Sequence, residues 1–123
     1  YAGTRNVKKL QELYHPNIIP LTLDITSPVN ILNAVAKIKK EHKTIDVLIN
    51  NAGYGLVSTV EDVSEEEMFE QFNINVFGLL RVTKNVIPLM RENSAGVIIN
   101  ISSFLGKIGL PLLTLYNSSK YAV

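Results

Sequence analysis

The chain has 123 residues, and its 12 Lys and Arg against 11 Asp and Glu give a formal net charge of +1. This length supports one domain with a hydrophobic core and is too short for two. A nucleic-acid-binding protein needs a clustered basic surface. The lysines at 8–9 and in the run 37–43 are instead typical of solvated helix ends, so no nucleic-acid partner is expected.

The sequence contains no cysteine, which excludes disulfides, thiolate catalysis and thiolate metal sites. His15 and His42 have no second ligand at metal-site spacing, so we expect no metal. No apolar run approaches the roughly 18 residues that span a membrane, and no signal-peptide pattern is present. We therefore expect no membrane association and a cytoplasmic location.

The chain begins with "YAGTRN" and has no initial methionine, so we expect it to be part of a longer protein. The first apolar run, at 17–24, predicts a strand. Ser27 is a good N-cap and Pro28 suits the first position of the helix that follows. One apolar stripe is expected on this helix, formed by Ile31, Leu32, Val35 and Ile38.

Two further apolar runs, at 45–50 and 95–102, predict strands buried under helices on both faces. Between them a long helix is expected, opened by a capping box of Ser64 and Glu67 and largely buried. In this helix Gly78 allows another backbone to approach, and Pro88 marks a kink or the final turn.

This alternation of strands and helices predicts an α/β fold with right-handed crossovers and a parallel sheet, in one domain spanning residues 1–123. In such sheets ligands bind beyond the carboxyl ends of the strands. The three strands end in small or polar residues at that edge, which predicts a ligand-binding rim there. These residues are Asp24, the stretch 50–53, Ser102 and Ser103.

Four motifs then carry a family resemblance: "NNAG" at 50–53, "NVFG" at 75–78, "NISS" at 100–103 and "YNSSK" at 116–120. In this order, and with Ser103 thirteen residues before Tyr116, they resemble the short-chain dehydrogenase/reductase (SDR) family over essentially the whole chain. The resemblance implies an incomplete Rossmann-type, doubly wound parallel sheet in three layers. It also implies truncation at both ends, because the family's Gly-rich phosphate-binding turn and its substrate region have no counterpart here.

The family's sheet order, 3-2-1-4-5, carries a further expectation. "YAGTRN" resembles the end of the family's second strand, and the missing first strand lies between the second and the fourth. We therefore expect the strand at 17–24 to have no neighbour among the others, and strand edges to be exposed.

Tyr116 and Lys120 share one helix face, and a nearby ammonium favours the phenolate form of a tyrosine. Taken alone, this spacing also fits a plain surface pair. The resemblance implies that Tyr116 is the catalytic acid or base, that Lys120 also binds the nicotinamide ribose, and that Ser103 holds the substrate oxygen. It implies further that the backbone of Asn75 helps to hold a water in a proton relay. The alternative for Ser103 is a turn cap, the role expected of Ser102, and Asn73 is a neighbour that does not match the motif.

The resemblance implies cofactor contacts from Asp24 and Ile25 near the adenine and from Asn51, Ala52 and Gly53 along the ribose. Asp24 could also be a plain turn residue. An acidic residue would bind the ribose 2′-OH of NAD. Thr4 and Arg5 stand near that place instead, and Arg5 suits a 2′-phosphate, so NADP(H) is favoured over NAD(H).

We therefore expect an oxidoreductase that transfers hydride between NADP(H) and a carbonyl or secondary alcohol, and that is a dimer or tetramer. The apolar stretch 104–113 either walls the substrate pocket or packs beneath the last helix. The alternative is a catalytically inactive α/β module that lacks the phosphate-binding segment. A signalling domain would need an acidic cluster or a phosphate loop at the strand ends, and the sequence has neither.

Overall fold

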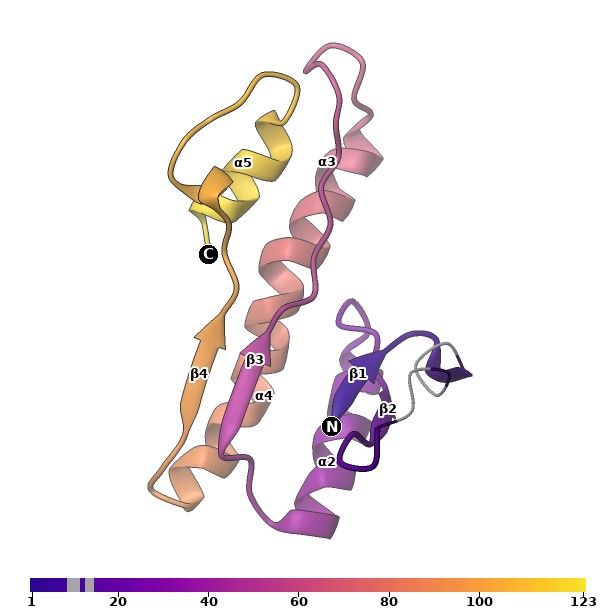
Figure 1. Cartoon of the computed structure of the whole chain (residues 1–123), viewed down its shortest axis with the longest axis vertical. Helices are drawn as coiled ribbons and strands as arrows, with labels where there is room; N and C mark the ends of the chain where they lie inside the picture. Colours follow the sequence, from indigo (N-terminus) through magenta and orange to yellow (C-terminus); the bar gives the residue numbers. More distant parts are fainter. Residues whose placement is uncertain (9–11, 13–14) are drawn as a thin grey trace.

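A computed structural model describes residues 1–8, 12 and 15–123, so Lys9 lies outside the described residues. In this part of the chain, four strands, four α-helices and two other helical segments follow one another (Figure 1). In chain order they are β1 (Ala2–Thr4), β2 (Pro20–Thr22), α2 (Pro28–His42), β3 (Val47–Asn50), α3 (Glu65–Phe72), the π-helical η1 (Asn73–Gly78), α4 (Leu79–Glu92), β4 (Val97–Asn100), the 3₁₀-helical η2 (Phe104–Gly106) and α5 (Thr114–Tyr121).

The strands form two parallel pairs, which confirms the α/β class. β1 pairs with β2, with Gly3 opposite Leu21, and β3 pairs with β4, with Leu48 opposite Ile98. The strand expected at 17–24 is reduced to β2, and the expectation that it has no neighbour is wrong because the opening segment supplies β1. Among the described residues no backbone pairing joins the two sheets.

The beginning of α2 follows from local chemistry. Ser27 is the N-cap and accepts a hydrogen bond from the backbone N–H of Asn30, and Pro28 takes the first helical position, as expected. Of the predicted stripe, Ile31 is buried, but Leu32 is 57% exposed. Ala34 is buried instead, because α2 turns this side towards β2 and α4.

The long helix predicted from residue 64 is continuous but changes its winding. Ser64 and Glu67 form the expected capping box at the start of α3. The backbone then passes through π-helical η1 before α4 continues one turn beyond Pro88. π-Helical segments are rare and often occur at functional sites. Arg81 supports the widened turn, since its Nη1 donates to Oδ1 of Asn73 at 2.7 Å.

The hydrophobic core lies between α2, α4 and one face of the strands. Ile31, Val82, Val86 and Met90 form its buried centre, and Leu48 packs against them. The other face of β3 and β4 is not covered by the described residues: Ile49 is 58% and Val97 is 54% exposed. The expected burial of these strands on both faces is therefore wrong for this part of the chain.

Two side-chain predictions on the long helix also need correction. Gly78 is close-packed, but against a side chain: a Cβ added there would lie 2.6 Å from Cδ1 of Ile25. The helix is also less buried than expected, because Phe69 is 69% and Leu80 is 54% exposed. One face of the helix packs on the core and the opposite face is bare.

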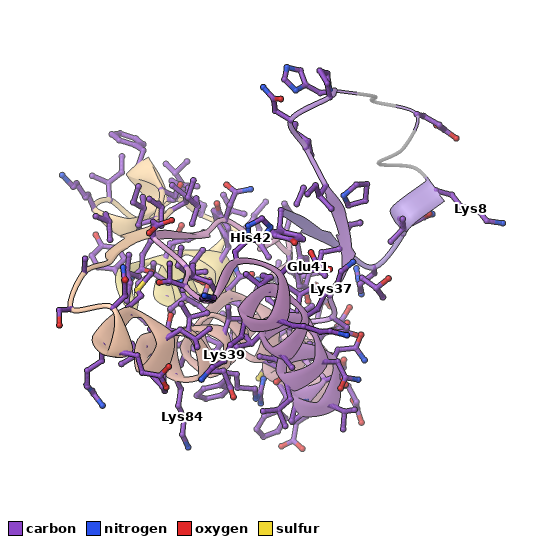
Figure 2. All side chains as sticks on the ribbon, turned by 90° about the horizontal axis from the view of Figure 1, so that it is seen from below. Lys8, Lys37, Lys39, Glu41, His42 and Lys84 are labelled. Atoms are coloured by element: carbon purple, nitrogen blue, oxygen red, sulfur yellow. The ribbon has the colours of Figure 1, made fainter. Side chains whose placement is uncertain are left out.

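The lysines labelled in Figure 2 do not gather in one patch. Lys8 extends from the segment after β1 at the right of the view, while Lys84 on α4 points away at its lower edge (Figure 2). Lys39 forms an ion pair with Glu92 at 3.0 Å, which ties α2 to the end of α4. No helix in the described part of the chain is both long and apolar enough to cross a bilayer.

Candidate active site

The carboxyl ends of β3 and β4 point towards the end of the molecule where α3 and α5 lie (Figure 1). α5 carries Tyr116 and Lys120, and the Lys120 Nζ lies 5.9 Å from the centroid of the Tyr116 ring. Lys120 is only 7% exposed, and its Nζ donates to the carbonyl oxygen of Ile101 at 2.9 Å. The structure therefore does not show a solvated surface pair. The Lys120 side chain packs from α5 against the segment that follows β4.

Asn75 lies in η1 and is 1% exposed. Its Nδ2 donates to the backbone oxygen of Tyr54 at 2.8 Å and to Oγ of Ser119 at 2.9 Å. Its Oδ1 accepts from the backbone N–H of Tyr54 at 3.0 Å. The side chain thus joins three parts of the site: the long helix, the loop after β3, and α5 next to Lys120.

Of the two serines after β4, Ser103 caps the turn, a role that was expected of Ser102. Ser103 is the N-cap of η2, and its Oγ accepts from the backbone N–H of Leu105 at 3.2 Å. Ser102 does not cap the turn, because its Oγ donates to the backbone oxygen of Lys120 at 2.7 Å. The capping bond uses a lone pair of the Ser103 hydroxyl, so the hydroxyl proton is still available to a substrate oxygen.

Gln71 is a site residue that the sequence analysis missed. It has no exposed surface, and it binds the loop after β3 with both ends of its amide. Its Oε1 accepts from the backbone N–H of Leu56 at 2.9 Å, and its Nε2 donates to the backbone oxygen of Tyr54 at 2.7 Å. The available signal was its position four residues before Asn75, which places the two amides on the same side of the helix.

A cavity of about 700 Å³ opens beside this group, across the ends of β1, β2 and β3. The resemblance places seven residues outside α5 around the nucleotide, and all seven line this cavity. They are Thr4, Arg5, Asp24, Ile25, Asn51, Ala52 and Gly53. Asn75, Ser103, Tyr116 and Lys120 are not among the lining residues.

Asp24 closes a local turn at the floor of the cavity. Its Oδ1 accepts from the hydroxyl of Thr26 at 2.7 Å and from the Thr26 backbone N–H at 2.8 Å. These bonds, and the positive charge of Arg5, lower the pKa of Asp24. The turn-forming role and a place in the ligand cavity therefore occur together in this residue.

Gly53 is the point where the cavity meets Asn75 and Lys120. A Cβ added there would lie 3.1 Å from Oδ1 of Asn75 and 3.6 Å from Nζ of Lys120. The absence of a side chain lets the loop backbone lie close to both polar groups. A ligand in the cavity that reaches past Gly53 would therefore arrive at Lys120.

The apolar stretch 104–113 does not pack beneath α5 with most of its side chains. Phe104 is 70%, Leu110 is 46% and Leu112 is 51% exposed. The backbone oxygen of Leu112 accepts from the N–H of Ser58 at 2.8 Å, which joins this stretch to the loop after β3. Two loops with exposed apolar side chains thus lie on the same side of the site.

Comparison with known proteins assigns the family. The family model for short chain dehydrogenases matches residues 2–123. An oxidoreductase of Schizosaccharomyces pombe is 41% identical over 119 residues, which cover 97% of this chain and 50% of that protein. The chain belongs to the short-chain dehydrogenase family, and it spans about half the length of this curated relative.

Solved structures agree on the architecture. ElxO with NADP bound has a TM-score of 0.89 and 31% identity, over 98% of this chain and 51% of that one. A xylitol dehydrogenase bound to NAD⁺ has a TM-score of 0.79 and 33% identity, over 84% of this chain and 40% of that one. The parallel strands and helices described above therefore form an incomplete Rossmann-type fold, as the sequence predicted.

Proposed function

We propose that this chain provides the catalytic residues and part of the cofactor site of an NADP(H)-dependent oxidoreductase. The protein would interconvert a carbonyl compound and a secondary alcohol. The observation that carries the proposal is the junction at Gly53, which joins the nucleotide-sized cavity to Lys120 and Asn75. Cavity and catalytic group are thereby arranged as consecutive parts of one site.

The nicotinamide, when bound, supplies or accepts the hydride. In carbonyl reduction the Ser103 hydroxyl donates a hydrogen bond to the substrate oxygen and orients it. The Tyr116 phenol then donates its proton to that oxygen, acting as a general acid. The ammonium of Lys120, close to the ring, stabilises the phenolate that remains. In alcohol oxidation the same groups act in reverse, with Tyr116 as the base.

The charges around the cavity support a dinucleotide with a 2′-phosphate. Arg5 lines it on the β1 side and places a positive charge there, whereas an NAD-selective site would hold a carboxylate for the ribose 2′-OH. Asp24 is held in its charged form by Thr26 and can accept a hydrogen bond from the adenine amino group. The loop 51–53 offers a backbone that a ribose can approach closely.

A homo-oligomer is part of the proposal, and the bare face of the long helix supports it. Phe69, Phe77 and Leu80 lie on α3, η1 and α4 with 69%, 46% and 54% of their surface exposed. Exposed apolar side chains on one helix face are typical of a subunit interface. A Leu80→Glu substitution is expected to shift the native mass towards the monomer in light scattering.

Nucleotide binding to the full-length natural protein tests the proposal. We expect calorimetry to detect NADPH with a lower Kd than NADH, and NADPH oxidation with some member of a panel of aliphatic and aromatic ketones. Tyr116→Phe should bind NADPH equally well and oxidise it at least about 10²-fold more slowly. If neither nucleotide binds, the dehydrogenase proposal fails and the inactive α/β module is the correct alternative.

A further inference from the structure

Gln71 is a completely buried amide side chain that the proposed reaction does not use. Burying an amide is unfavourable unless its polar atoms are hydrogen-bonded. Both ends of Gln71 are bonded, and both partners are backbone atoms of the loop after β3. The side chain thus has a specific partner that lies 15 to 17 residues away in the sequence.

The two backbone partners lie on either side of a single residue, Gly55. The Tyr54 oxygen and the Leu56 N–H are both bound by Gln71. Asn75, one turn further along the helix, binds the N–H and the oxygen of Tyr54. Four hydrogen bonds therefore hold the backbone around Gly55 against the long helix.

Gly55 in turn lies against the ring of Tyr116. A Cβ added at Gly55 would lie 3.3 Å from Cδ2 and 3.4 Å from Cγ of that ring. Only a residue without a side chain leaves the ring at its present distance from the loop. The position of the loop backbone therefore limits where the phenol can lie.

We propose that Gln71 is a positioning residue for Tyr116: it fixes the backbone around Gly55 and so sets the surface on which the phenol ring rests. The inference rests on the proposed function only in so far as the placement of this phenol matters for a reaction. The contact itself is a property of the described residues. A displaced acid or base reduces turnover because catalysis depends on sub-ångström placement of the reacting groups.

The direct test is the NMR signal of the Tyr116 ring in the full-length natural protein with ¹³C-labelled tyrosine. The signal is assigned by its loss in Tyr116→Phe. In Gln71→Met, which keeps the side-chain length and removes both hydrogen bonds, we expect this signal to shift or broaden. The matched control is Asn85→Ala, since the Asn85 amide donates to the Arg81 oxygen of its own helix, and we expect no change there.

Gly55→Ala tests the same contact from the loop side and does not depend on the stability of Gln71→Met. The added methyl must displace the ring or the loop by a few tenths of an ångström, so the Tyr116 signal should shift here too. An unchanged Tyr116 signal in both Gln71→Met and Gly55→Ala would overturn the proposal. This holds whether or not the protein binds a nucleotide.

Turnover provides a second measurement, and a purely structural role of Gln71 would not give the pattern expected here. With NADPH and the ketone that the natural protein reduces fastest, Gln71→Met should lower kcat by about tenfold or more and leave both KM values within about threefold. In the Tyr116→Phe background the same substitution should have no further effect on kcat. An equal loss in both backgrounds would contradict action through Tyr116. A natural protein that binds no nucleotide would overturn the proposed function, while the NMR result would still decide the positioning role.

Discussion

The two halves of the site are held together in different ways. Around Tyr116 and Lys120 the hydrogen bonds join residues that are distant in sequence, such as Asn75 with Ser119 and Lys120 with Ile101. On the Arg5 and Asp24 side of the nucleotide cavity, the side-chain hydrogen bonds are local. Thr26 binds Asp24 two residues earlier, and the Asn6 N–H binds the Thr4 hydroxyl at the same spacing.

This difference indicates a division of labour. In the catalytic half, around Tyr116, the side chains of Asn75, Ser119 and Lys120 are buried and hydrogen-bonded, which is the preorganisation that the proposed proton transfer needs. The nucleotide half consists of short strands and turns whose polar side chains remain accessible. Substitutions in the catalytic half should therefore affect folding or turnover, and those in the nucleotide half should affect ligand affinity with little change in stability.

The largest expected effect is that of Tyr116→Phe on turnover. Loss of the phenol hydroxyl should lower kcat by about 10²- to 10⁴-fold, the usual contribution of general acid–base catalysis, with an unchanged Kd for NADPH. Steady-state kinetics and calorimetry measure the two quantities. Tyr121→Phe on the same helix is the control, since Tyr121 is 57% exposed and has no proposed role. A comparable loss of kcat in the control would contradict the role of Tyr116 as the general acid or base.

Asn75→Leu should mainly affect stability. It removes the Asn75 partner of the part-buried Tyr54 N–H and of the buried Ser119 hydroxyl. Each such group costs about 1–3 kcal/mol, so we expect a loss of roughly 2–4 kcal/mol in the free energy of unfolding, measured by urea denaturation. Asn85→Ala should lose less than about 1 kcal/mol. Equal losses would show that the catalytic half is not held more firmly than an ordinary helix surface.

Arg5→Ala should change affinity and not stability. Loss of a charged hydrogen bond to a 2′-phosphate should raise the Kd for NADPH about tenfold or more, leave that for NADH unchanged, and shift the free energy of unfolding by less than about 0.5 kcal/mol. Lys8→Ala removes a nearby positive charge that does not line the cavity and is the control. If both nucleotides weaken equally, Arg5 does not read the 2′-phosphate.

The smallest expected effect is on the pH dependence of stability. The pKa of Asp24 is lowered in the folded state, so its contribution to stability is present above its ordinary pKa of about 4 and is lost as the pH falls through the folded value. Asp24→Asn should therefore flatten the decline of Tm below about pH 4. At pH 7 it should lower Tm only slightly. An unchanged acid decline would show that the turn with Thr26 does not stabilise the carboxylate.

The same contrast explains what the sequence could predict. Ser27, Pro28 and the Ser64–Glu67 capping box act on atoms within one helical turn, and all were predicted correctly. The parallel arrangement followed from the order and apolar character of the segments. The sequence also predicted that the motif residues of the nucleotide half lie together, because each follows a strand that ends at the same edge of the sheet.

The failures concern distant partners. Leu32 fits the apolar stripe of α2, but its exposure depends on which elements cover that side. The sequence did not show which of Ser102 and Ser103 caps the turn, and Ser102 bonds instead to the backbone oxygen of Lys120, eighteen residues away. Gln71 was missed because its partners are backbone atoms of a distant loop, and its spacing from Asn75 was the one signal in the sequence.

The central claim is that the cavity beside Arg5 and Asp24 and the catalytic group on α5 form one continuous site through Gly53. The most direct measurement is a crystal structure of the full-length natural protein with NADP⁺. The account predicts a 2′-phosphate beside Arg5 and a nicotinamide ribose within hydrogen-bonding distance of the Lys120 Nζ, with the nicotinamide ring facing Tyr116. A nucleotide bound with its nicotinamide directed away from Tyr116 and Lys120 would contradict it.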